Sequence, residues 1–197
     1  MTRRSIDLKV PTDTEWVHTV LDQFDEFLAD HANCERKASA LAMSLVVKYP
    51  DRAPIIPTLI ELAREELQHF QQVYALMVER GVALVADTPD PYVGALQKLM
   101  RSGREERFID RLLISSVIEC RGAERFGIIA RALAEDGREP KLAEFYHELW
   151  AAETKHGHQF ADMARKLYGD SIYPRLEELM EAESEIIATL PWRASLH

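Results

Sequence analysis

The sequence predicts an all-α protein built around a bundle of four helices. Glycine and proline are scarce, with 8 and 9 among 197 residues, and long stretches contain neither, which favours helices over a turn-rich β fold. Within these stretches apolar residues recur at alternating spacings of three and four, as expected of helices with one buried face. A chain of this length fits one domain with a sizeable core, so we expect residues 1–197 to form a single domain.

The first two predicted helices are joined by a short turn. The first covers residues 14–49, with a candidate break near Leu21, and ends at Pro50 because proline cannot continue a helix. The second begins at about Pro54 or Pro57, because proline is acceptable in the first turn of a helix. It ends at Gly81, which follows a basic last turn and is suited to cap the helix.

The rest of the chain supplies a long connection, two more bundle helices and a final helix. These segments are a connection over 82–103 with room for a short helix after Pro91, helices over about 104–135 and 139–168, and a last helix over about 174–189. Connections that run short, long, short are typical of ferritin-like bundles with one crossover. We therefore predict a ferritin-like four-helix bundle over about 14–168, with one long crossover and an extra C-terminal helix packed outside it.

The composition predicts a cytoplasmic protein. No run approaches the roughly 20 apolar residues that a membrane span needs, and the basic N-terminal segment lacks the apolar stretch of a secretory signal. The two cysteines, Cys34 and Cys120, form no Cys-x-x-Cys motif and are too few for a disulfide framework. We expect both to be buried as small apolar residues.

Net charge does not identify the partner of this protein. The formal charge of −9 argues at face value against a nucleic acid. The charge is unevenly spread, however, because residues 98–111 are rich in arginine whereas residues 177–185 carry acids and no base. A nucleic-acid partner therefore stays open.

Two copies of one motif mark a candidate metal centre. Glu35 is followed by Glu66-x-x-His69, and Glu119 is followed at a similar spacing by Glu153-x-x-His156. Each Glu-x-x-His pair places a carboxylate and an imidazole on one helix face, one turn apart. Four carboxylates and two imidazoles that project inward from four helices would bind two metal ions, and this donor set suits iron or manganese.

Helical phase separates these residues from other acids. The second helix has the inward series Leu59, Leu62, Glu66, His69, Val73 and Leu76, and the fourth has Leu142, Tyr146, Leu149, Glu153, His156, Phe160, Met163 and Leu167. A third pair, Glu144-x-x-His147, lies half a turn away and is expected to face water. Buried carboxylates need counter-charge, so the inward acids bind metal or, as the alternative, pair with arginine or histidine.

Two positions remain open at this point. On the third helix Glu119 and Glu124 lie in two different apolar series, and we prefer Glu119 because its spacing to the following motif mirrors that of Glu35. On the first helix His31 lies one turn before Glu35. It is either a hydrogen-bond partner of a metal ligand or a core histidine with a structural role.

Four segments of the chain resemble a known family: DHANCERKASALAMSLVVKYPDR, LAREELQHF, LLISSVIECRGAERF and LAEFYHELWAAETKHGHQF. They are similar to the tRNA isopentenyladenosine hydroxylases (MiaE), ferritin-like di-iron monooxygenases, and the likeness covers about residues 14–168. The resemblance implies O2-dependent hydroxylation of the isopentenyl side chain of 2-methylthio-N(6)-isopentenyladenosine in tRNA, next to the anticodon. Carried over by motif, the iron ligands are Glu35, Glu66, His69, Glu119, Glu153 and His156, with no further catalytic residue.

The implied reaction also requires partners. The resemblance implies two iron ions as cofactor. Because the chain has no dinucleotide-binding motif, P-loop or iron–sulfur cysteine set, we expect a separate reductase as electron donor. Candidate tRNA contacts are Lys98, Arg101, Arg104, Arg107 and Arg111, with Arg121 and Arg125 as further cations and Tyr92 and Phe108 to stack a base. A solvated face of mixed charge explains the same cations equally well. The alternative function is a ferritin-like ferroxidase or iron-binding protein.

Overall fold

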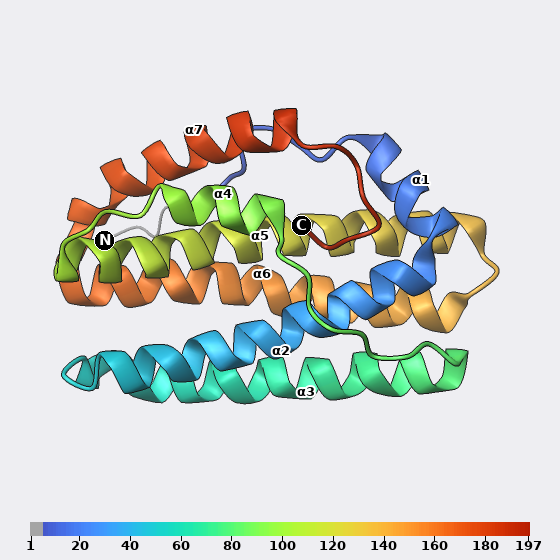
Figure 1. Ribbon diagram of the computed structural model, residues 1–197, viewed down its shortest axis with the longest axis horizontal. Helices are drawn as coiled ribbons and strands as arrows, with labels where there is room; N and C mark the ends of the chain where they lie inside the picture. The colour runs from blue at the N-terminus through green and yellow to red at the C-terminus, as the bar shows by residue number, and fades with distance from the viewer. Residues whose placement is uncertain (1–5) are drawn as a thin grey trace. The chain divides into compact units, whose positions relative to one another are not determined.

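The computed structural model describes residues 6–197, which form helices joined by short loops and one long connection (Figure 1). The α-helices are α1 (Thr14–Asp22), α2 (Phe24–Lys48), α3 (Ile56–Arg80), α4 (Pro91–Lys98), α5 (Arg104–Asp136), α6 (Pro140–Tyr168) and α7 (Tyr173–Thr189). Short 3-10 turns, η1 (Ala53–Ile55) and η2 (Gly169–Ile172), lead into α3 and α7. Within the described residues, no helix has the length and apolar content to cross a membrane.

These bounds confirm the predicted order of helices. The break expected near Leu21 falls at Gln23, which separates α1 from α2. Gly81 has a φ of 69° and its N–H caps α3 as predicted, because glycine tolerates the left-handed conformation that this cap requires. The long connection contains α4, which begins after Asp90, whose side chain accepts hydrogen bonds from the first helical N–H groups.

The chain divides into two compact units. The α2–α3 unit contains residues His18–Thr88 and Trp192–Leu196. The α5–α6 unit contains the described residues up to Val17, Pro89–Pro191 and His197. Helix α1 therefore begins in the α5–α6 unit and ends in the α2–α3 unit, while α4 and α7 belong to the α5–α6 unit.

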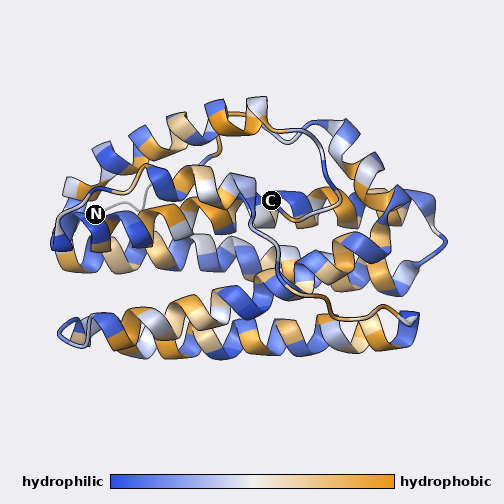
Figure 2. Ribbon diagram, in the orientation of Figure 1, coloured by the Kyte–Doolittle hydropathy of each residue, from blue (hydrophilic) through white to orange (hydrophobic). Residues whose placement is uncertain are grey.

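In the α2–α3 unit the two long helices pack against each other as an antiparallel hairpin (Figure 1). Leu45 of α2 and Leu62 and Val73 of α3 are buried, and burial of such side chains stabilises a fold by about 1.5–3 kcal/mol each. Ser39 Oγ on α2 donates a 2.8 Å hydrogen bond to Ala63 O on α3. Figure 2 shows hydrophobic and hydrophilic residues interleaved along both helices, which is the periodicity that predicted them.

In the α5–α6 unit, α5 and α6 form a second long hairpin, and α4 and α7 pack on α5 as well. The rings of Phe126 on α5 and Tyr146 on α6 lie 5.7 Å apart and contribute to the contact between these two helices. Because further helices cover α5, three of its charged residues are buried with its apolar ones: Asp110, Arg121 and Arg125. Each of these needs a partner inside the unit.

Candidate metal centre

The α2–α3 unit brings one candidate carboxylate of α2 together with the Glu-x-x-His pair of α3. Glu35 and Glu66 are only 3% and 1% exposed. His69 Nδ1 lies 3.5 Å from Glu35 Oε2 and 3.8 Å from Glu66 Oε2. The three side chains that helical phase selected in this unit therefore converge.

His31 contacts the candidate ligand Glu35. Its Nε2 atom lies 2.7 Å from Glu35 Oε1, and the imidazole is fully buried beside the ring of Phe27, with 5.8 Å between the ring centroids. Of the two roles open for His31, the structure therefore supports that of hydrogen-bond partner to Glu35. This bond uses one carboxylate oxygen, and the other, Oε2, is the oxygen nearer to His69.

In the α5–α6 unit the second Glu-x-x-His pair is also buried. Glu153 is 2% exposed and His156 is fully buried, and His156 Nδ1 lies 2.9 Å from Glu153 Oε2. Glu119 is half-buried on α5. The next residue on α5, Cys120, packs directly on Gly157 of α6, so Glu119 and His156 lie at the same level of this helix pair.

The competing carboxylate Glu124 is bonded to other groups. Its two oxygens accept hydrogen bonds from the backbone N–H (2.9 Å) and hydroxyl (2.7 Å) of Thr12, and it forms an ion pair with Arg121. Glu124 therefore anchors the N-terminal segment to α5. This engagement favours Glu119 as the α5 carboxylate of the candidate centre.

The third Glu-x-x-His pair behaves as its phase predicted. Glu144 and His147 are both exposed on α6, although they belong to the same helix as the buried pair. Counting motifs alone would not have distinguished the two pairs. Position within the apolar series did.

Cys120 lies beside Glu119 and packs against α6. Burial, together with the charge of Glu119, raises the pKa of the Cys120 thiol to about 12. Cys34 and Cys120 are half-buried rather than buried as the sequence predicted, and Cys120 packs against Gly157 of α6.

The chemistry of the two clusters fits a metal ion. Each unit supplies two carboxylates and one imidazole, and in each unit the Glu-x-x-His pair offers ligand atoms to an ion. A neutral imidazole does not offset the charge of buried carboxylates, whereas a divalent cation does. Oxygen and nitrogen donors without thiolate suit iron or manganese.

The candidate tRNA contacts fall into different environments. Lys98, Arg104 and Arg107 are exposed, and Arg111 is half-buried. Arg101 is exposed too, but its backbone N–H and guanidinium donate hydrogen bonds of 2.7–3.1 Å to the buried Asp110. Its side chain therefore anchors the connection that precedes α5 to Asp110 of that helix.

Asp110 also binds α7, a contact that the sequence did not suggest. Arg175 donates to both Asp110 oxygens, at 3.0 and 2.9 Å, and to Leu99 O at 2.6 Å. Burial on its own would raise the pKa of Asp110, but the hydrogen bonds from Arg175 and Arg101 outweigh it and hold the pKa below its usual value. The carboxylate therefore stays charged and joins α7 and the connection to α5.

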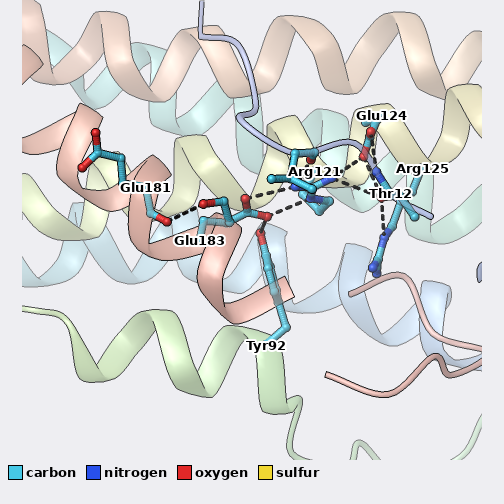
Figure 3. Close-up of polar contacts among 9 residues, drawn as sticks. Thr12, Tyr92, Arg121, Glu124, Arg125, Glu181 and Glu183 are labelled. Atoms are coloured by element: carbon cyan, nitrogen blue, oxygen red, sulfur yellow. Dashed lines mark hydrogen bonds and ion pairs between the residues drawn. The ribbon is translucent and has the colours of Figure 1, made fainter. Parts of the chain in front are cut away.

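The prediction that two further cations and two aromatic residues contact tRNA is wrong. All four side chains are buried: Arg121, Arg125, Tyr92 and Phe108. Arg121 is fully buried and grips Glu183 of α7 through two hydrogen bonds of 2.8 and 3.0 Å (Figure 3). Arg125 is 2% exposed and lies over the ring of Trp16, 4.7 Å from its centroid. Tyr92 and Phe108 are fully buried, and the Tyr92 hydroxyl donates to Glu183 Oε1 at 3.0 Å.

Comparisons with known proteins agree with the resemblance of the four segments. The family model described as tRNA-(MS2IO6A)-hydroxylase (MiaE) matches residues 2–197. A Pseudomonas putida protein named tRNA 2-(methylsulfanyl)-N(6)-isopentenyladenosine(37) hydroxylase is 35% identical over 91% of this chain and 86% of its own. A Salmonella typhimurium protein of the same name is 26% identical, over 91% of this chain and 83% of its own.

A solved structure supports the fold. It is described as protein 43 with aldehyde deformylating oxygenase activity, from Synechococcus. It matches 96% of this chain and 94% of its own with a TM-score of 0.87 and 34% identity. This likeness confirms the predicted fold class, all-α and ferritin-like.

Proposed function

Because the chain belongs to the MiaE family of tRNA hydroxylases, we propose that it hydroxylates the isopentenyl side chain of 2-methylthio-N(6)-isopentenyladenosine in tRNA, next to the anticodon. The observation that carries this proposal is that each unit contains a buried carboxylate–imidazole cluster formed by residues of the repeated motif. A tRNA substrate places the proposed reaction in the cytoplasm.

The proposed ligands of two iron ions are the six residues of the repeated motif: Glu35, Glu66, His69, Glu119, Glu153 and His156. Iron bound by these residues would supply the activation of O2 that hydroxylation of a C–H bond requires. The chain itself contributes ligand orientation and exclusion of water. His31 holds Glu35 Oε1, which leaves Oε2 on the side of His69, and apolar neighbours such as Val73 and Phe160 keep bulk water from the donors.

The electrons for the reaction come, in this proposal, from a separate reductase. The sequence contains two cysteines, fewer than the four that hold a common iron–sulfur cluster. It also lacks the glycine-rich motifs that bind flavin and nicotinamide cofactors. A redox partner protein is therefore part of the proposed system.

For tRNA, the exposed cations Lys98, Arg104 and Arg107 are the proposed phosphate contacts. They lie on α4 and on the first turn of α5, in the half of α5 that precedes Glu119. Arg111, half-buried one turn further along α5, is a secondary candidate. Arg101 contributes to this surface mainly by fixing the connection through Asp110.

The decisive experiment is nucleoside analysis of prenylated tRNA after incubation with the iron-loaded, chemically reduced protein and O2. We expect a new hydroxylated nucleoside whose mass exceeds that of the substrate by one oxygen. Glu153→Ala should abolish the product and the matched variant Glu144→Ala, altered in the exposed pair, should retain it. No product from protein with two bound iron ions would contradict the assigned substrate.

The same experiment tests the alternative function. A ferritin-like ferroxidase would oxidise Fe2+ without tRNA and would assemble into a large shell that a sizing column detects. The proposed hydroxylase instead couples O2 consumption to nucleoside formation. Oxidation of added Fe2+ while the tRNA stays unhydroxylated would favour the alternative.

A further inference from the structure

We propose that Gly157, held by Ser116 and Cys120, sets the spacing between α5 and α6 and so positions the metal ligands of the α5–α6 unit. This inference rests on the proposed function for the identity of those ligands. It concerns a residue that carries no side chain and contributes no donor atom. Its role is to let two helix backbones approach each other.

The approach at Gly157 is too close to admit a side chain unless neighbouring atoms move. A Cβ atom added there would lie 2.6 Å from Cys120 Sγ, 3.2 Å from the Cys120 backbone nitrogen and 3.4 Å from Ser116 O. Two of these three atoms belong to the α5 backbone, so a change of rotamer cannot move them. The thiol has only one torsion, and its surroundings are close-packed.

A buried hydrogen bond holds the two helices at this separation. Ser116 Oγ donates to Gly157 O at 2.6 Å, and Ser116 is fully buried. If the helices moved apart, the buried hydroxyl of Ser116 would lose its acceptor, which would destabilise the fold. The contact therefore limits separation of the helices through the hydrogen bond and limits closer approach through the backbone.

The contact lies at the level of the proposed ligands. Gly157 directly follows His156 and lies one turn after Glu153, while Cys120 directly follows Glu119. Since an α-helix rises about 1.5 Å per residue, every ligand of this unit lies within about one turn of the contact. A shift of one helix at this contact therefore moves the metal-ligating atoms by nearly the same distance.

The size of the expected shift is sufficient to disturb a metal site. Moving a new methyl from 2.6 Å to an ordinary contact of 3.4 Å from the thiol requires a displacement of about 0.8 Å. Sites of this kind tolerate errors of only about 0.5 Å in ligand position. Gly157→Ala should therefore weaken metal binding without removing any ligand.

A matched control is available on the same pair of helices. A Cβ on Gly127 of α5 would meet the ring of Trp150 of α6 at 3.2–3.3 Å. That ring belongs to an exposed side chain that can yield, and Gly127 lies eight residues, about 12 Å, beyond Glu119. Gly127→Ala thus adds the same methyl to the same interface, at a point where an exposed side chain rather than a helix backbone can move.

The test is anaerobic titration of the full chain with Co2+ as a probe whose visible absorption reports ligand geometry. Relative to the unsubstituted protein, Gly157→Ala should weaken Co2+ affinity at least tenfold and alter the absorption bands, whereas Gly127→Ala should change neither. Thermal unfolding followed by circular dichroism compares the stability of the two variants. Equal Co2+ affinity and spectra for Gly157→Ala and the unsubstituted protein would overturn the inference.

Two further variants test the proposed cause. Ser116→Ala removes the hydrogen bond without adding an atom, and should weaken Co2+ affinity severalfold, whereas its neighbour Ser115→Ala, also buried, should not. Adding Cys120→Ala to Gly157→Ala removes the shortest contact and should restore part of the affinity. No effect of Ser116→Ala, or no rescue in the double variant, counts against the spacing role. Failure of the unsubstituted protein to bind metal would instead refute the proposed function.

Discussion

The two helical hairpins carry the same ligand motif but support it in different ways. In the α2–α3 unit a side chain, His31, holds Glu35 directly. In the α5–α6 unit the ligand helices meet through backbone atoms at Gly157, and a serine bonds across the contact. One metal motif is thus supported by a hydrogen bond to a ligand in the first hairpin and, in our proposal, by the separation of the helices in the second.

The units also differ in how completely their helices are covered. Among the residues that the structure describes, ten large apolar side chains are exposed. Eight of them belong to the α2–α3 unit: Met43, Val47, Ile60, Leu67, Tyr74, Val78, Leu84 and Val85. In the α5–α6 unit the additional helices bury α5 and its charges. That unit therefore relies on buried arginine–carboxylate ion pairs, such as that of Arg121 and Glu183.

The largest effect is expected at the ion pair between α5 and α7. Glu183→Ala would leave the fully buried Arg121 with Glu124 as its remaining acidic partner, so we expect a loss near the lower end of the about 3–5 kcal/mol that follows removal of one partner of a buried pair. Denaturant unfolding should show this decrease in the free energy of unfolding. The exposed Glu181, two residues earlier on α7 and visible beside the network in Figure 3, gives the matched variant Glu181→Ala, which should change stability little. Equal losses in the two variants would contradict a special role for the pair.

A second variant tests the carboxylate that joins α7 and the connection to α5. Asp110→Asn weakens hydrogen bonds to two arginines, and we expect a loss of about 1–3 kcal/mol at pH 7. The pKa of Asp110 is lowered in the fold, so its stabilisation is present above the ordinary carboxyl value near 4 and is lost as pH falls through the lowered pKa. Unfolding measured from pH 7 downward should therefore show the two proteins converging in acid. A difference that is constant with pH would argue against the charge.

The smallest effect in free energy is expected at His31, where metal binding is the measurement. His31→Ala removes the partner of Glu35, and loss of such a partner typically weakens metal affinity about 10–100-fold. His31→Gln keeps an amide donor and should recover part of this affinity. The exposed His147 provides the control His147→Ala, for which affinity should be unchanged. If His31→Ala binds Co2+ with normal affinity and spectrum, the two hairpins do not differ in the way described.

Periodicity predicted the helices and the inward residues well, for a physical reason. The face of a helix that meets its hairpin partner must be apolar, so Glu66 and His69 are conspicuous on α3, and the exposed pair Glu144 and His147 is recognisable by its phase. Those inferences depend on spacings of three and four within one helix. The bounds of α2, α3, α5 and α6 followed from the same pattern with glycine and proline at the ends.

The same reasoning failed where a helix has a second covered face. Arg121, Arg125, Tyr92 and Phe108 were predicted to reach tRNA because their residue types suit a phosphate or a base. They are buried because α4, α7 and the N-terminal segment cover α5, and their partners are far away in sequence. Glu183 lies 62 residues after Arg121, and such a distant pairing cannot be predicted from a local sequence pattern.

The long sequence separation of these contacts has a consequence for the order of assembly during synthesis. The α2–α3 hairpin relies on contacts such as that between Ser39 and Ala63, and it can form as soon as α3 has left the ribosome. Arg121 binds Val10 and Thr12, more than a hundred residues earlier, as well as Glu183 in α7. Most of the chain must therefore be translated before the N-terminal segment can dock on α5. We expect the α5–α6 unit to close late, after the α2–α3 hairpin has formed in the first half of the chain.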